Sequence, residues 1–555
     1  MSDPLAELRA SIAAVAATVA DGDATEPPSL ERPPKPEMGD YSTNAAMLLA
    51  PGAGAKPRDV AERLAEGLRA ELADGLADAE VAGPGFVNLR LADRWHREAV
   101  AGILSAGSRL GTSTGTDPER VLVEFVSANP TGPLTAAGGR GAAYGDSLAR
   151  LLEARGHEVG REYLLNDVGG QVERFAQSIA ARMRGEPVPD DGYEGEYVAE
   201  LASALDAAGV EPDDVDGIAR AGTDAMRGRI AATLERFGVR FDTWFSERTL
   251  HESGALEATI DELRSKGHAY DREGAVWLRT TEFGDDKDRV LVRAGGEPTY
   301  FAADIAYHRD KLGRGWERTI DPLGSDHHGY VPRMRAALDA LDGAGAAYEA
   351  PIMQLVQIVE GGQRARMSKR KGQFVTLDEL IDDIGVDATR FFMLQRSHDT
   401  ALDLDLDLAR SQSQDNPVYY VQYAHARIAS ILRKAVAEKG VPADSGGAAD
   451  EDAIAAAAGA GEAIAAAVEP SEGALVRRLL ELPGEVAQAA ERRAPHRLCA
   501  YAGATAADFH GFYRDCQVVG VDEPLQASRL ALCVAASRVI ARTLSLLGVS
   551  APERM

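Results

Sequence analysis

The spacing of apolar and polar positions divides the chain into three parts. In the first part, two helix-period segments (LAELRASIAAVAATVA and RDVAERLAEGLRAELA) precede the alternating segment AGPGFVNLRLA, which predicts helices followed by a strand. From 121 to about 395, short apolar runs such as VLVEFV alternate with helix-period segments, as they do in parallel α/β sheets. Beyond 415 only long Ala- and Leu-rich helix periods remain. We therefore predict a multidomain α/β protein with a small α+β unit, a doubly wound domain and an all-α domain.

The middle part carries one interruption. Between about 172 and 290 the sequence becomes helix-rich and contains a hairpin signal, AVWLRTT followed by DRVLVR. We place the domains at 1–100, 101–395 and 396–555, with this insertion inside the second domain. The stretch ALDLDLDLAR at 401–410 lacks the glycine and terminal glutamate of a calcium loop. Its alternation of leucine and aspartate favours a half-buried strand or connector.

Charge adds a feature that the periodicity does not show. The 555 residues include 87 Asp and Glu against 60 Lys and Arg, a formal net charge of −27, and residues 57–265 contain no lysine. Such a halophile-like surface suits a cell with molar internal salt, where the Debye length falls to about 3 Å; an ordinary acidic cytosolic protein is the alternative. Nucleic-acid binders are usually basic, but molar salt weakens that argument, so the charge does not decide the partner.

Two further features limit the classes of protein to which the chain can belong. No stretch approaches the roughly 20 apolar residues of a membrane span, and the N-terminus carries acids where a signal peptide carries positive charge. The three cysteines show no metal-ligand spacing and are too few for a disulfide framework. We expect a soluble, cytoplasmic protein without a membrane partner.

Two segments carry the candidate chemistry. SANPTGPLTAAGGRGAAYGD at 127–146 follows the apolar run VLVEFV and leads into a helix pattern, a strand–turn–helix layout that suits phosphate. RMSKRKG at 366–372 gathers basic residues beside glycines in a lysine-poor chain. A basic loop of this kind can close over a polyphosphate, although a solvated basic turn is the plain alternative.

Together the two segments resemble the paired signatures of class I aminoacyl-tRNA synthetases, and further blocks narrow the resemblance to arginyl-tRNA synthetases. Blocks similar to that family follow in the family's order over essentially the whole chain: GDYSTNAAMLL, AGPGFVNLRL, YLLNDVGGQ, FDTWFSER, YFAADIAYHRDK, GSDHHGYVPRM, RMSKRKGQFVTLDELIDDIGVDATRFFML, NPVYYVQYAHARI and LLGVSAPERM. The resemblance implies an arginine–tRNA ligase with a Rossmann-like class I catalytic domain, an N-terminal additional domain and a helical anticodon-binding domain. It also implies tRNA(Arg), L-arginine and ATP with Mg²⁺ as partners, no protein metal site, and a monomer.

The resemblance assigns the arginine site. Asp304 and Glu247 would take the guanidinium, a planar fork that carboxylates bind in bidentate fashion, and Tyr300 would pack on it or bond to it. Glu124 and Asn129, at the end of the first strand and the start of the turn, would hold the α-amino group. The alternative for Asp304 and Glu247 is membership of surface ion pairs.

The ATP site would combine the turn, the basic loop and the GSDHHG block. Lys369 would stabilise the departing pyrophosphate, Arg366 would be a second catalytic residue, and Met367 and Ser368 would contact ATP. Asp326, His327 and His328 would lie near the adenosine, with His327 also at the arginine edge. The same block could instead hold a metal, as in DHH phosphoesterases. That chemistry needs further Asp/His clusters, and no clear set is present among the 11 histidines.

The first signature departs from the family pattern. Where the family has His-x-Gly-His after Pro133, this chain has Thr135 to Gly138, so both histidines are absent. We interpret Gly138, Gly139, the Thr135 hydroxyl and Arg140 as replacements that meet phosphate in place of imidazole. The alternative is a non-catalytic tRNA-binding paralogue that kept the shape and lost the chemistry.

The ends of the chain supply the tRNA candidates. Tyr420, Tyr423 and Arg427 combine aromatic and basic side chains in a helix pattern, which suits an anticodon loop, although core packing is the alternative for the tyrosines. Near the N-terminus, Tyr41 and Asn44 are candidates for contact with the tRNA elbow.

Overall fold

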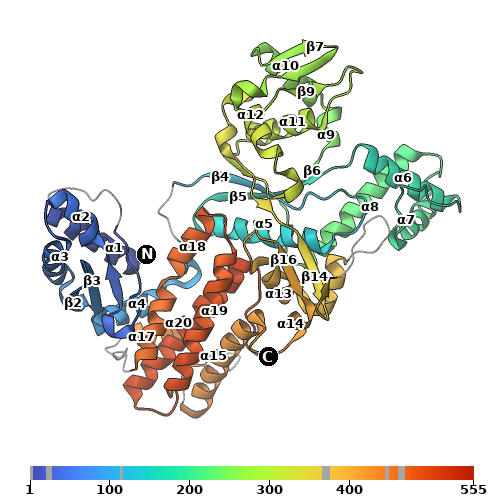
Figure 1. The fold of residues 1–555 in the computed structure, drawn as a ribbon. Coiled ribbons are helices and arrows are strands. Elements are labelled where there is room, and N and C mark those ends of the chain that lie inside the picture. Colours follow the sequence, from blue (N-terminus) through green and yellow to red (C-terminus); the bar gives the residue numbers. More distant parts are fainter. Residues whose placement is uncertain are drawn as a thin grey trace.

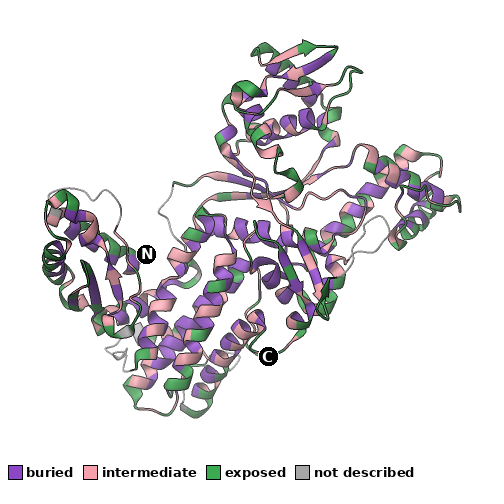
Figure 2. Ribbon diagram, in the orientation of Figure 1, coloured by how far each residue is buried: buried purple, intermediate pink, exposed green. Residues whose placement is uncertain are grey.

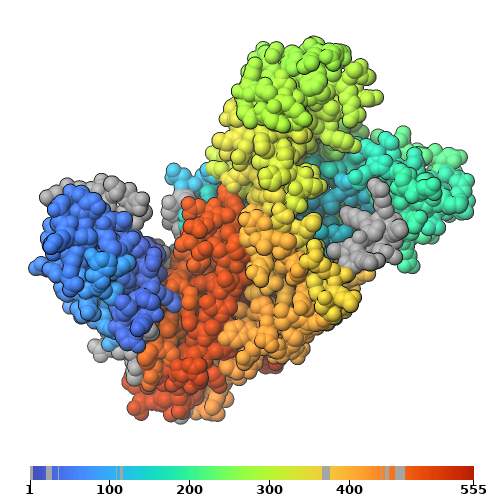
Figure 3. All heavy atoms as spheres, viewed as in Figure 1, coloured from blue at the N-terminus to red at the C-terminus, as the bar shows by residue number. Residues whose placement is uncertain are grey.

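The computed structural model describes residues 4–20, 28–112, 117–364, 375–439, 441–443, 449–459 and 469–555. The chain runs through an N-terminal lobe, a central sheet from which two further lobes project, and a C-terminal helical bundle (Figure 1). The space-filling view shows the N-terminal lobe and the lobe drawn in green standing out from the body (Figure 3).

The N-terminal lobe is a three-stranded antiparallel sheet covered by helices. Its strands lie in the order β1 (Tyr41–Thr43), β3 (Phe86–Leu91) and β2 (Leu76–Ala82), and its helices are α1 (Pro4–Ala20), α2 (Ala45–Ala53) and α3 (Pro57–Leu72). The inward positions of the alternating strand, Val87 and Leu89, are completely buried against the helices. The connecting helix α4 (Asp93–Ala106) packs on the C-terminal bundle.

The central sheet has five parallel strands in a doubly wound order. From one edge to the other they are β12 (Tyr348–Glu349), β10 (Arg318–Ile320), β4 (Arg120–Glu124), β5 (Glu158–Leu165) and β6 (Thr243–Ser246). The chain therefore builds outward from β4 to β6 and then returns to the other side of β4 with β10. Sheets of this kind bind ligands at the carboxyl ends of the strands where the order reverses, here between β4 and β10.

Two lobes, rather than one insertion, interrupt the sheet. The first consists of α6 (Gly170–Met183), α7 (Glu196–Ala207) and α8 (Val215–Arg236). The second consists of α9 (Arg248–Glu252), α10 (Ala255–Ser265), β7 (Ala269–Arg272), β8 (Ala275–Leu278), β9 (Arg289–Val292), α11 (Tyr300–Gly313), β11 (Leu323–Gly324) and α12 (Tyr330–Asp342). The predicted hairpin is confirmed, because β8 and β9 pair antiparallel. The single insertion over 172–290 is wrong, because β6 returns to the sheet within that range.

A smaller sheet joins the central domain to the bundle. It contains β14 (Val356–Glu360), flanked by β15 (Gln363–Arg364) and β16 (Leu402–Asp405), and lies beside α13 (Leu377–Leu394) and α14 (Leu406–Arg410); β13 (Ile352–Met353) precedes it. Leu402 and Leu404 are buried while Asp403 is exposed, which confirms the half-buried strand predicted from the leucine–aspartate alternation. The helix α5 (Ala136–Ala154) packs tightly on α13.

The C-terminal bundle surrounds one apolar helix. Its members are α15 (Pro417–Lys439), α16 (Glu451–Gly459), α17 (Pro470–Leu480), α18 (Leu482–Glu491), α19 (His496–Asp515) and α20 (Glu523–Leu547). The helix α20 is long and apolar enough to cross a membrane, contrary to our expectation, but 78% of its most apolar window is buried inside the protein. Figure 2 shows the buried surfaces running through the bundle and the neighbouring α5. We therefore read α20 as a core helix.

Candidate active site

The carboxyl ends of the parallel strands open onto two adjoining pockets. A pocket of about 270 Å³ is lined by Asn129, Leu164, Asn166, Val168, Gln171, Glu247, Leu250, Tyr300, Ala303, Asp304 and Tyr307. A pocket of about 690 Å³ shares six of these, Asn129, Leu164, Asn166, Gln171, Asp304 and Tyr307. The larger pocket also reaches Glu124 and Asp321, at the ends of β4 and β10. One continuous cleft therefore lies at the point where the strand order reverses.

Two carboxylates face the smaller pocket without a cation. Glu247 lies directly before α9, and Asp304 lies in the first turns of α11. Within the part of the chain that the structure describes, no ion pair reaches either carboxylate. Burial, with repulsion from Asp304 and Asp167, raises the pKa of Glu247 to about 7. Burial also raises the pKa of Asp304 to about 6, although Tyr330 partly opposes it by a hydrogen bond. The pair is therefore arranged for a cationic ligand.

Asp167, which the sequence reasoning missed, holds the turn that carries Glu247. Its carboxylate accepts hydrogen bonds from the Ser246 hydroxyl (2.6 Å) and from the Arg248 amide (3.1 Å). Asp167 therefore binds the residues on both sides of Glu247. The Arg248 guanidinium returns a hydrogen bond to the Asp167 carbonyl (2.8 Å). An acid directly after a strand that ends at the reactive edge of the sheet was the available signal.

Asn129 and Tyr300 lie at the edges of the smaller pocket. The Asn129 amide donates to the Gln171 side chain at 2.6 Å, which places both residues over the cleft. Tyr300 is 68% exposed, and its hydroxyl lies close to the backbone of Gly169, where an added Cβ would approach it to 3.1 Å. Both predicted residues are at the cleft, with Tyr300 at its rim.

Glu124 is at the cleft but already has partners. Its carboxylate accepts hydrogen bonds from the Lys311 ammonium (2.5 Å) and from the Ser127 hydroxyl (2.8 Å). Val126 and Ser127 adopt left-handed backbone angles, with φ of +69° and +39°, which is costly for a β-branched residue. This strained turn places the Ser127 hydroxyl where it also accepts from the Leu164 amide (3.1 Å). Ser127 thus links the splayed ends of β4 and β5.

The prediction that Arg140 meets phosphate is wrong. Its side chain is buried, and its guanidinium donates to the carbonyls of Gln354 (2.8 Å), Ser397 (2.8 Å) and Thr400 (3.0 Å). Burial lowers its pKa. Because its donors are directed into the protein, Arg140 ties α5 to the segments that precede β14 and β16.

The first signature turn touches the residues that follow the basic segment. The Ala136 amide donates to the Val375 carbonyl (3.0 Å), and the Leu377 amide donates to the Leu134 carbonyl (2.8 Å). A Cβ at Gly139 would lie 2.8 Å from the Leu377 side chain, so this glycine allows helix packing rather than approach to phosphate. The predicted role of Gly139 is therefore wrong. The first signature turn therefore lies beside residues 375–377, which follow the second signature in the sequence.

Thr135 caps the helix that begins at this turn. Its hydroxyl accepts from the Gly138 amide at 3.4 Å, which leaves the hydroxyl hydrogen available to an acceptor. Pro133 is half-buried just before it. The predictions for Arg366, Met367, Ser368 and Lys369 lie outside the described residues.

Comparison with known proteins decides the family. Residues 6–91 match the arginyl tRNA synthetase N-terminal domain, and residues 421–555 match the DALR anticodon binding domain. The chain is 47% identical to the arginine–tRNA ligase of Frankia alni over 98% of this chain and 99% of that protein. This chain belongs to the arginyl-tRNA synthetase family.

Solved structures agree with this assignment. A putative arginyl-tRNA synthetase from Campylobacter jejuni superposes with a TM-score of 0.75 at 32% identity, over 84% of this chain and all of that one. The Thermus thermophilus arginyl-tRNA synthetase gives a TM-score of 0.75 at 24% identity, over 99% of this chain and all of that one, which shows the shared fold. The arginyl-tRNA synthetase fold, with its N-terminal, parallel-sheet and helical domains, is thus the fold of this chain.

The GSDHHG block lies at the mouth of the larger pocket. Asp326, His327 and His328 are all exposed; Asp326 and His327 line the pocket, whereas His328 is not among its lining residues. The described residues contain no group of three or more His, Cys, Asp or Glu side chains that could hold a metal ion. Two of the three side chains of this block are therefore at the cleft.

The two N-terminal tRNA candidates are packed into the lobe. Tyr41 is only 3% exposed and lies edge-on to Trp95, so the prediction that it contacts tRNA is wrong. Asn44 is half-buried, and its side chain accepts from the Ser29 amide at 2.9 Å. Both positions stabilise the lobe.

The C-terminal candidates form a surface cluster. The Arg427 guanidinium lies over the rings of Tyr423 (4.6 Å) and Tyr513 (4.8 Å), and it donates to the Tyr423 hydroxyl (2.7 Å). Tyr420 packs against His510, with ring centres 4.9 Å apart. Tyr513, 43% exposed, was missed because it lies on a different helix. Apart from Tyr420, which directly precedes the matched range, the cluster sits within the DALR anticodon binding domain.

Proposed function

We propose that this chain is an arginine–tRNA ligase that activates L-arginine with ATP and transfers it to the 3′ end of tRNA(Arg). The observation that carries the proposal is the small pocket with the buried Glu247 and the half-buried Asp304, whose carboxylates form no ion pair with the described residues. Membership of the arginyl-tRNA synthetase family supports the same substrate.

The chemistry of the pocket favours a guanidinium over an ammonium. Arginine presents five donors in a rigid plane, so two carboxylates approaching from different elements can each take part of the fork. Lysine offers a point charge that cannot satisfy both in the same way. At the other end of the cleft, Glu124 and Asn129 would receive the α-amino group.

The activation step needs positioning and charge, without a covalent enzyme intermediate. The arginine carboxylate would attack the α-phosphate in line, and Lys369 with Arg366 would stabilise the departing pyrophosphate. The Thr135 hydroxyl is free to donate toward phosphate, and Asp326 and His327 would contact the nucleotide at the pocket mouth. Mg²⁺ bound with ATP would neutralise phosphate charge.

The transfer step places tRNA across the domains. The A76 ribose 2′-hydroxyl would accept the arginyl group, while Tyr420, Tyr423 and Arg427, joined by Tyr513, would contact the anticodon loop. We propose that the enzyme acts as a cytoplasmic monomer. That the net charge of −27 is an adaptation to molar internal salt stays a prediction.

A non-catalytic tRNA-binding paralogue is the second candidate, favoured by the absence of histidine from positions 135–138. The test is arginine-dependent ATP–pyrophosphate exchange and charging of tRNA(Arg), from dilute to molar KCl. Exchange and charging with arginine, but not with lysine, are expected of the ligase. Binding of tRNA without either activity at any salt concentration would instead establish the paralogue.

A further inference from the structure

We propose that Lys311 is a positioning residue that fixes the distance between the two ends of the arginine site and thereby selects the length of the substrate side chain. The proposal rests on the proposed function, because it takes Asp304 and Glu247 as the guanidinium end and Glu124 as the amino end. Lys311 itself need not touch arginine.

The helix that carries Asp304 belongs to the lobe rather than to the sheet. In its first turns, Phe301, Ala302 and Ile305 are buried in an apolar cluster of the lobe, together with Leu263 and Leu278. This cluster is distinct from the main core that contains the strands β4 and β5. Apolar packing therefore fixes α11 within its lobe, and a second face of the helix, Ala303, Ala306 and Tyr307, packs on Leu164 of β5 and Phe245 of β6.

Polar contacts from the second half of α11 add a direct link to the strand ends. Lys311 is completely buried, and its ammonium lies 2.5 Å from the Glu124 carboxylate and 3.1 Å from both oxygens of Asp321. Glu124 ends β4 and Asp321 directly follows β10. One ammonium thus bridges the two strands between which the sheet order reverses.

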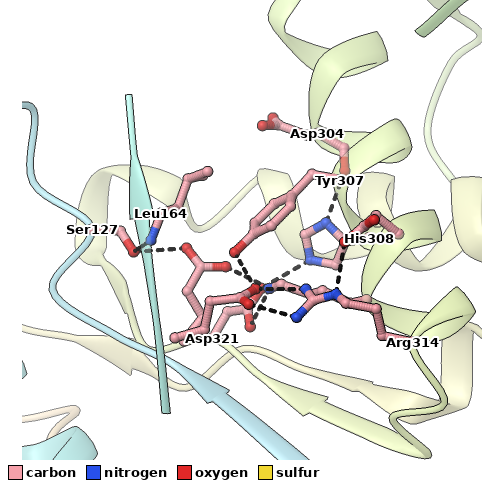
Figure 4. Close-up of polar contacts among 11 residues, drawn as sticks. Ser127, Leu164, Asp304, Tyr307, His308, Arg314 and Asp321 are labelled. Atoms are coloured by element: carbon pink, nitrogen blue, oxygen red, sulfur yellow. Dashed lines mark hydrogen bonds and ion pairs between the residues drawn. The ribbon is translucent and has the colours of Figure 1, made fainter. Parts of the chain in front are cut away.

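Neighbouring side chains reinforce the same attachment. His308 lies 2.9 Å from the Asp321 carboxylate through one ring nitrogen and 2.9 Å from the Asp304 carbonyl through the other. Just after the helix, Arg314 donates twice to Glu162 on β5 (2.7 and 2.9 Å). Figure 4 shows these contacts converging on the strand ends, while the Asp304 carboxylate stands apart from them.

In this arrangement the position of α11 sets the distance between the guanidinium end and the amino end of the arginine site. Asp304 precedes Lys311 by seven residues, a rise of about 10.5 Å along a helix. Because Lys311 bonds to Glu124 itself, any change in the length of this contact moves Asp304 relative to the amino end of the site. Hydrogen-bonded ion pairs are directional, so they specify that spacing more sharply than apolar surfaces, which can slide. One methylene in a fitted site is worth about 10–200-fold in discrimination.

Two charge-conserving variants lengthen the contact from opposite sides. Lys311→Arg extends the cation, and Asp321→Glu extends its partner on β10. For each, ATP–pyrophosphate exchange in the presence of tRNA(Arg) gives kcat/KM for arginine and for homoarginine, which is one methylene longer. The control, Lys266→Arg, alters a lysine in the same lobe that pairs with Glu262 and Asp342, away from the cleft.

We expect the arginine-to-homoarginine ratio of kcat/KM to fall about tenfold in Lys311→Arg and Asp321→Glu and to stay unchanged in Lys266→Arg. Equal losses for both substrates would overturn the proposal, since a purely structural role lowers both together. Loss of the fold in both variants would overturn it as well, because the contact would then serve stability alone. If the wild-type protein shows no arginine-dependent exchange, the proposed function is what fails.

Discussion

The cleft is bordered by two groups of buried acids that differ in one respect. At the strand ends, Glu124, Glu162 and Asp321 are each held by Lys311 or Arg314. In the smaller pocket, Glu247 and Asp304 have no such partner among the described residues. The first group attaches a helix to the sheet, whereas the second is left for a ligand. Burial alone therefore does not mark a binding acid; burial without a cation does.

The electrostatics of the two groups differ accordingly. Burial alone would lower the pKa of Lys311, but Asp321 and Glu124 outweigh it, so its pKa lies above the ordinary value and the ammonium stays charged. In the pocket, burial raises the pKa of both acids instead, with repulsion from Asp304 acting on Glu247 and repulsion from Glu124 acting on Asp304. The free protein thus carries a charge imbalance that bound arginine would relieve, a common conflict between stability and function.

The largest effect is expected from removing a cation at the strand ends. Arg314→Met leaves Glu162, whose side chain is completely buried, without its ion pair. We expect a loss of about 3–5 kcal/mol in the free energy of unfolding of the catalytic domain, measured by urea denaturation. The control Arg309→Met removes the more exposed pair with Glu262 and should cost under about 1 kcal/mol. Equal losses of stability in Arg314→Met and Arg309→Met would contradict the view that the strand-end ion pairs hold the domain together.

Neutralising a pocket acid should act in the opposite direction on stability. Glu247→Gln and Asp304→Asn each remove a charge-assisted hydrogen bond to arginine, worth about 1.5–3 kcal/mol, so kcat/KM for arginine should fall about 10–100-fold. At pH 8 the same variants should unfold at an equal or higher temperature than wild type, because repulsion is relieved. Steady-state charging and thermal melts check both. A destabilised variant with normal arginine kinetics would contradict the assignment.

The pocket should also impart a smaller dependence on pH. As pH rises through about 6 and 7, Asp304 and Glu247 lose their protons, so kcat/KM for arginine should increase about tenfold or more and level off above pH 8. Since both folded-state pKa values exceed the unfolded ones, the free protein should lose stability as pH rises from about 4 to about 7. The Glu247→Gln profile should lack the step near pH 7. A flat wild-type profile between pH 5 and 8 would refute this account.

The smallest effect concerns the phosphate end. Thr135→Ala removes the helix cap, which should cost about 1 kcal/mol of stability. If the hydroxyl also donates to phosphate, the KM for ATP should rise about tenfold, whereas Thr135→Ser should restore it. Exchange kinetics at varied ATP measure this. An unchanged KM for ATP in Thr135→Ala would show that the Thr135 hydroxyl only caps the helix and that other groups bind the phosphate.

The sequence by itself determined much of the architecture. Period-2 and period-3.6 patterns predicted the hairpin of β8 and β9 and the half-buried strand at Leu402 and Leu404, because these depend on local spacing. The ordered blocks predicted the arginyl-tRNA synthetase family and, with it, Asp304, Glu247, Asn129 and Glu124, which all line the cleft. Glu124 ends one parallel strand and Glu247 follows another, and such strands present their carboxyl ends at one edge, whereas Asp304 comes from a helix of the lobe.

The tertiary structure decided which partner each polar side chain has. Arg140 lies at a helix start that looked ready for phosphate, yet its guanidinium turns toward three carbonyls that are more than two hundred residues away in the chain. Tyr41 looked available and is packed against Trp95. Lys311 was unremarked in its block and proves to bridge two strands. Local patterns carry the periodicity that forms helices and strands, but the pairing of charges across distant segments exists only after the chain has folded.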